Sequence, residues 1–142
     1  MPKLLHLSSF LFATTIHNAF ICQDFLYHNV CLTLTCLSIA THWSVGNLPI
    51  IRYLKMLDHI VAHLCFGLCL YTYITEAYNA DILYLGFIFP TIISSLWFYE
   101  NNCNNIELVY KIHLILHILS VIALNIAISI RYQNKLDLRA LA

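Results

Sequence analysis

Two histidines, His113 and His117, stand four residues apart in the segment "HLILH". Residues at positions i and i+4 lie on one face of an α-helix, so both imidazoles can reach the same point. Paired imidazoles are common ligands of transition metals. Ser38 and His42 repeat this spacing in "SIATH". Both motifs lie in strongly apolar segments, where a polar side chain is costly unless it has a partner.

The composition is typical of an integral membrane protein. The chain has 142 residues, of which 61% are hydrophobic and only 10% charged, and its mean hydropathy is +0.76. Seven basic and seven acidic side chains cancel, so the chain has no net positive charge that would favour nucleic-acid binding. Six cysteines occur without zinc-finger spacing, and we interpret them as small core residues.

Apolar runs of about 20 residues are long enough to cross the hydrocarbon core of a bilayer as helices. The sequence contains about five of them, separated by short segments with charges and turn formers. We therefore predict an all-α fold: a multi-pass transmembrane helical bundle forming a single domain, 1–142. The expected helices lie near 4–22, 25–45, 50–75, 81–99 and 106–130. The clearest loop is "ENNCNN", residues 100–105.

The first run permits a second interpretation. A basic Lys3 precedes an apolar stretch, as in a secretory signal peptide. His6 and His17 interrupt the run, and no A-x-A site follows it. The basic residues divide almost evenly between the two sides of the membrane, so neither the orientation nor the identity of that membrane follows from the sequence.

In an alternating five-helix chain, the end of the second helix and the starts of the third and fifth lie at one bilayer face. His42, Asp58, His113 and His117 occupy those places, together with Ser38. Asp58, His113 and His117 would lie roughly 10 to 16 Å below the starts of their helices. His42 would be about one turn shallower unless its helix continues to about residue 47.

This set of side chains suits zinc-dependent hydrolysis. Three histidines with an open fourth position form a catalytic zinc site, in which the pKa of the bound water falls to about 7. Asp58 would take a proton from that water and return it to the leaving group, and Ser38 would orient the carboxylate or donate to the developing oxyanion. A site inside the membrane implies a lipid amide or ester substrate that enters sideways.

The motifs "SIATH", "LDH" and "HLILH" resemble, in the same order, those of the CREST-type superfamily of membrane hydrolases and receptors. This superfamily includes alkaline ceramidases, adiponectin-type receptors and GPI-remodelling proteins. The resemblance implies that His42, His113 and His117 bind zinc, with Asp58 and Ser38 beside the metal-bound water.

The chain departs from that superfamily in length. Its members have seven helices, whereas this sequence has room for about five. Two helices would be missing between Asp58 and His113, and an even number keeps the last motif at the correct face. No residue that would define ceramide, sterol or GPI recognition carries over. A bundle this small also suggests a homo-oligomer.

Two other functional classes stay open. His59 and His63 form another i, i+4 pair on a face rotated from Asp58. Either could pair with His113 or His117 as axial ligands of haem in an electron-transfer protein. Alternatively, the polar residues fix helix packing and bind nothing.

Overall fold

The computed structural model describes residues 8–43, 49–77 and 79–141. Within these ranges the chain forms one short 3-10 helix and five α-helices, which confirms the predicted all-α fold. The elements are η1 (Ser9–Leu11), α2 (Phe12–Ile21), α3 (Phe25–Trp43), α4 (Pro49–Glu76), α5 (Ala80–Asn102) and α6 (Ile106–Ala140). The expected helical residues 4–7 and 44–45 lie outside the described ranges.

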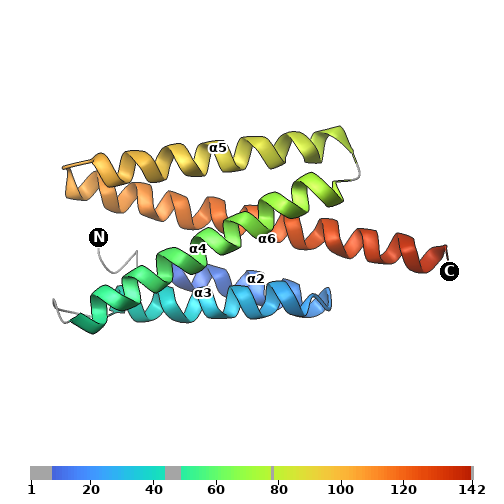
Figure 1. The fold of residues 1–142 in the computed structure, drawn as a ribbon, viewed down its shortest axis with the longest axis horizontal. Coiled ribbons are helices and arrows are strands. Elements are labelled where there is room, and N and C mark those ends of the chain that lie inside the picture. Colours follow the sequence, from blue (N-terminus) through green and yellow to red (C-terminus); the bar gives the residue numbers. More distant parts are fainter. Residues whose placement is uncertain (1–7, 44–48, 78, 142) are drawn as a thin grey trace.

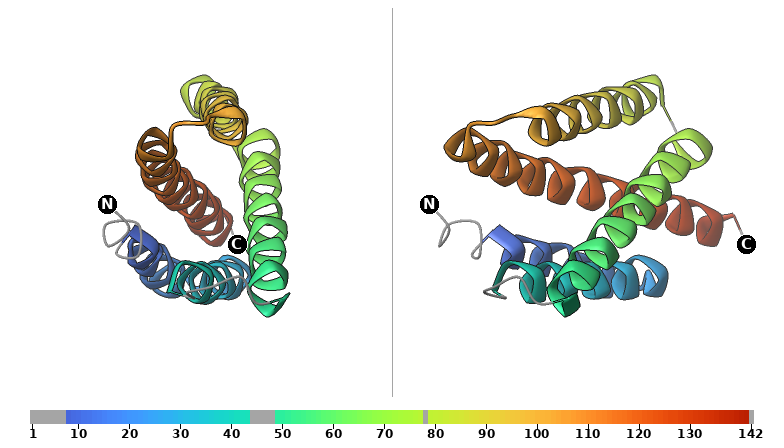
Figure 2. Two further views of the ribbon diagram at one scale, coloured as in Figure 1. Left: turned by 90° about the vertical axis from the view of Figure 1, so that its left-hand side faces the viewer. Right: turned by 60° about the vertical axis from the view of Figure 1, so that its left-hand side comes forward.

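Helices α4 and α6 form the centre of the bundle. Both pack against α5 on one side, and on the other α4 packs against α3 and α6 against α2. The left panel of Figure 2 looks along the bundle and shows α4 and α6 between α5 and the α2–α3 pair. In Figure 1, the end of α3 and the start of α6 lie at the same end of the molecule.

Among the helices of the described ranges, three are long and apolar enough to cross a membrane by length and composition: α4, α5 and α6. Ser9–Ile21 is a shorter apolar helix. The segment is integral to the bundle in this structure, because Thr15 and Ala19 are fully buried. Asn18 also donates a hydrogen bond to Asn125 of α6 at 2.9 Å.

The turn between α2 and α3 is tighter than its sequence suggests. Gln23 adopts a positive φ of 52°, and the backbone N–H of Asp24 reaches the carbonyl of Ala19 at 2.9 Å. This pattern is a Schellman motif, which ends a helix in the left-handed conformation. The Asp24 carboxylate then accepts a hydrogen bond from the N–H of Tyr27 at 3.3 Å and so caps α3.

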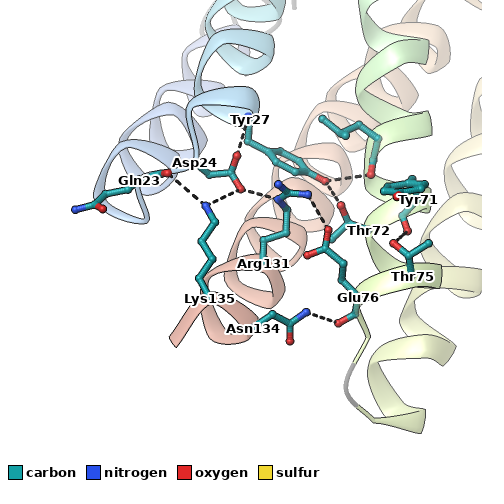
Figure 3. Close-up of polar contacts among 11 residues, drawn as sticks. Gln23, Asp24, Tyr27, Tyr71, Thr72, Thr75, Glu76, Arg131, Asn134 and Lys135 are labelled. Carbon is teal, nitrogen blue, oxygen red and sulfur yellow. Dashed lines mark hydrogen bonds and ion pairs between the residues drawn. The ribbon is translucent and has the colours of Figure 1, made fainter. Parts of the chain in front are cut away.

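Figure 3 shows a charged cluster where the α2–α3 turn, the end of α4 and α6 meet. Arg131 of α6 donates from Nε to Asp24 at 2.6 Å and from Nη1 to Glu76 of α4 at 2.7 Å. Lys135 lies 3.5 Å from the same Asp24 oxygen. The Arg131 guanidinium also lies over the ring of Tyr27. Two acids and two bases thus join the α2–α3 turn, the end of α4 and α6.

The core beside this cluster depends on close packing of α4 and α5. Tyr73 of α4 is buried and donates a hydrogen bond to the carbonyl of Ala123 at 3.1 Å. Gly86 of α5 lies against it, and a Cβ added there would be 2.5 Å from the Cβ of Tyr73. The absence of a side chain at Gly86 therefore allows α5 to approach α4.

The Gly86→Ala variant tests this approach. We expect it to lower stability by about 1–3 kcal/mol, because the added methyl group forces α5 away from Tyr73. Thermal unfolding in detergent, followed by circular dichroism, measures the change. Gly67→Ala is the matched control, since a Cβ at Gly67 meets nothing within 4 Å. Equal melting temperatures for both variants would contradict the assignment.

The ion pairs of Asp24 predict a pH dependence. Burial raises the pKa of this carboxyl, but the hydrogen bond from Arg131, the Tyr27 N–H and the neighbouring charges outweigh burial and hold the pKa below its ordinary value. Its contribution to stability is present above the unfolded-state pKa of about 3.9 and is lost as the pH falls through the lower folded value.

Melting temperatures in detergent between about pH 6 and pH 3 measure this contribution. The wild type should lose more stability over that range than Asp24→Asn, whereas the exposed control Asp137→Asn should follow the wild type. Parallel curves for the wild type and Asp24→Asn would show that the Asp24 ion pairs contribute nothing.

Candidate metal centre

His42, His113 and His117 come together between α3 and α6. Their ring centroids are 5.1 Å apart for His42 and His113, 5.5 Å for His42 and His117, and 4.7 Å for His113 and His117. One nitrogen of each ring lies within 4.8 Å of one nitrogen of both others. His117 is buried and the other two are half-buried. The predicted convergence of these three histidines is confirmed.

The helix geometry removes the expected depth mismatch of His42. His42 lies one residue before the end of α3, whereas His113 lies seven residues after the start of α6. Ring contact between them requires α6 to begin about 10 Å beyond the end of α3. Figure 1 shows that α5 and α6 do reach further than α3 at this end.

The Nδ1 atoms of both α6 histidines have hydrogen-bond partners. His113 Nδ1 lies 2.7 Å from Glu100 Oε1, at the end of α5, and His117 Nδ1 lies 2.8 Å from Ser8 Oγ. His113 Nε2 is buried, and among the described residues it has no hydrogen-bond partner. Nδ1 is therefore engaged in both rings, which leaves Nε2 as the nitrogen to coordinate a metal.

The three histidines fit a metal ion. A tetrahedral zinc with Zn–N bonds of 2.0–2.1 Å holds its nitrogen ligands about 3.4 Å apart. Nitrogens that already lie within 4.8 Å of one another need only a small inward movement to reach that arrangement. The edge of the Phe12 ring packs on His117, with centroids 5.5 Å apart, and restricts its rotation. The cluster can therefore hold a metal, whose identity the geometry leaves open.

Asp58 and Ser38 line a cavity of about 180 Å³ together with His113 and His117. Asp58 Oδ1 is buried without a hydrogen-bond partner in the described part of the chain. Ser38 is buried and lies 3.0 Å from Ser9 Oγ, so its hydroxyl already has a partner. The cavity thus joins the predicted base to two of the predicted ligands.

His59 and His63 lie elsewhere on the same cavity. Both are exposed, whereas Asp58 is half-buried. His63 donates from Nδ1 to the carbonyl of His59 at 2.6 Å, and its ring meets Trp97 edge to face at 5.2 Å. Neither belongs to the cluster of ligand atoms formed by the other three histidines. The sequence predicted that His59 and His63 point in a different direction from Asp58, and their greater exposure agrees with this.

The sequence did not reveal that Glu100 and Ser8 would contact the histidines of α6. The sequence pattern placed Glu100 in a loop, but α5 continues to Asn102 and only residues 103–105 connect it to α6. Asn105 caps α6 by accepting from the N–H groups of Glu107 and Leu108. So short a connection makes α5 and α6 antiparallel neighbours, which was the one available signal that Glu100 would lie near His113.

Searches against protein-family models, curated proteins and solved structures each found no match to this chain.

Metal analysis of the detergent-purified protein tests the cluster directly. We expect about one zinc per chain in wild type prepared without chelator. The double variant His113→Ala, His117→Ala should lose this metal while remaining folded. Its matched control is His59→Ala, His63→Ala, which removes two histidines with the same spacing outside the cluster. Wild type free of zinc, or a control that loses as much metal, would show that the cluster is no zinc site.

Proposed function

We propose that this protein is a zinc-dependent intramembrane hydrolase that cleaves a lipid amide or ester. The observation that carries this proposal is the three-histidine cluster, two of whose members line a cavity that also contains Asp58. Structural zinc sites usually have four protein ligands, whereas catalytic sites have three and an open position. Three converging imidazoles beside a cavity match the catalytic type.

The charges around the cavity favour a divalent cation. Asp58 and Glu100 both line it, and the described lining residues include no lysine or arginine. An ionised carboxylate inside a membrane segment costs several kcal/mol unless positive charge is near. A divalent ion held by three neutral histidines would balance the two carboxylates, and zinc is the usual divalent ion for three nitrogen ligands.

A bound zinc would supply Lewis acidity and bring the pKa of a bound water to about 7. Asp58, whose Oδ1 has no hydrogen-bond partner within the described ranges, would be the base that accepts the proton of the attacking water and returns it to the leaving nitrogen or oxygen. Ser38 lines the same cavity from α3. Its bond to Ser9 fixes the position of the hydroxyl, which suits a group that orients the substrate carbonyl.

The dimensions of the cavity support a lipid substrate. Its volume of about 180 Å³ is below the roughly 300–1,000 Å³ of pockets that enclose a drug-sized ligand. It therefore has room for the carbonyl region of a lipid rather than the whole molecule. The hydrocarbon chains would stay on the apolar outer surfaces of α4 and α5, where Leu64 and Phe87 are exposed. The resemblance of the motifs to the ceramidase-type superfamily agrees with this substrate class.

The variant Asp58→Asn separates catalysis from metal binding. We expect hydrolysis to fall by about 10²–10⁴-fold, because the amide cannot accept the proton. Zinc content should stay at the wild-type level. The assay measures fatty acid release by mass spectrometry from a ceramide, an N-acylethanolamine and a phospholipid ester in mixed micelles.

Asp137→Asn, an exposed change at the far end of α6, is the control and should keep full activity. Full activity in Asp58→Asn would remove the proposed base. Zinc-loaded wild type that releases no fatty acid from any of these substrates would contradict the hydrolase. A red, haem-containing preparation would replace it with electron transfer.

A further inference from the structure

The side chain of Glu100 has one described hydrogen bond, and its partner is His113, a proposed metal ligand. Its Oε1 lies 2.7 Å from His113 Nδ1, and the two side chains are only 16% and 23% exposed. Its Oε2 is buried, with no hydrogen-bond partner in the described ranges. This carboxylate is therefore largely shielded from water, and the imidazole of His113 is its described hydrogen-bond partner.

We propose that Glu100 is a positioning residue that fixes His113 as an Nε2 metal ligand. This inference rests on the metal site of the proposed function. A neutral imidazole has one N–H, and an ionised carboxylate can only accept a hydrogen bond. The proton of His113 must then sit on Nδ1. The lone pair is left on Nε2, the buried atom without a partner in the described part of the chain.

The two α6 histidines differ in this respect. His117 Nδ1 is bonded to the hydroxyl of Ser8, which can either donate or accept. Ser8 therefore permits both tautomers, whereas Glu100 permits one. A carboxylate also makes the imidazole more basic, and loss of such an outer partner typically weakens metal binding by about 10–100-fold. The effect of Glu100 on affinity should therefore exceed that of Ser8.

Glu100 also connects the site to the least buried of the long helices. Only 6% of the most apolar stretch of α5 is buried inside the bundle. The main neighbours of α5 are α4 and α6. The three-residue connection 103–105 places the end of α5 beside the start of α6. Through Glu100, α5 would influence the metal without supplying a ligand.

Zinc affinity, measured by competition with a chromogenic chelator, tests the assignment. We expect Glu100→Gln to bind zinc about 10–100-fold more weakly than wild type, because glutamine retains the shape but loses the charge. Glu107→Gln, an exposed acid at the start of α6, is the matched control and should keep wild-type affinity.

Cobalt provides a second readout that a purely structural role would not alter. The visible absorption of the cobalt-substituted protein reports ligand geometry, so Glu100→Gln should shift its bands while Glu107→Gln should not. Unchanged affinity and unchanged bands in Glu100→Gln would overturn the proposal while leaving the hydrolase intact. Wild type that binds neither metal would instead refute the proposed function.

The tautomer can be measured in wild type if Glu100→Gln does not fold. Nitrogen-15 NMR of histidine-labelled protein distinguishes a protonated Nδ1 from a protonated Nε2. The proposal requires Nδ1 to be protonated in His113, with or without metal. A proton on Nε2 of His113 in the neutral ring would refute it.

Discussion

The arrangement of this bundle depends on the need to satisfy polar groups where little water is present. Inside a bilayer, a backbone or side-chain polar group without a partner costs several kcal/mol, which leaves helices as the natural form of such a chain. The same constraint then acts on side chains. Asn18, Thr15 and Asn125 bond across α2 and α6, and Tyr27 bonds Thr72 across α3 and α4. These bonds join neighbouring helices and act together with apolar packing to fix their register.

Much of the fold followed from the sequence because the same constraint leaves a strong pattern there. Apolar runs separated by short polar segments predicted five helices, and the part of the chain that the structure describes forms five α-helices with similar boundaries. The misses are local. The helix α6 continues to Ala140, because a helix can leave the apolar layer and still pair its own backbone. The Gln23 turn was unforeseen because glycine, not glutamine, usually takes its left-handed conformation.

The metal cluster was predictable to the extent that spacing and alternation determine it. His113 and His117 share a face by helix geometry, and alternation brings His42 to the same end. Their partners were not predictable in this way. The bond from Glu100 depends on where α5 ends, and the bond between Ser9 and Ser38 depends on how η1 lies against α3. Both are details of tertiary packing that no periodic pattern records.

Buried carboxylates have different surroundings at the two ends of the bundle, the α2–α3 turn and the cavity beside the histidine cluster. At the α2–α3 turn, Asp24 and Glu76 are matched by Arg131 and Lys135, so that cluster is complete without a ligand. Around the cavity, the described lining places no lysine or arginine beside Asp58 and Glu100. The same helix, α6, contributes to both places: it supplies the basic residues of the charged cluster and two of the three histidines of the metal cluster. Because the described lining of the cavity contains neither lysine nor arginine, positive charge beside the two carboxylates has to come from the imidazoles or from a bound ion. The three converging imidazoles could hold such an ion as a metal.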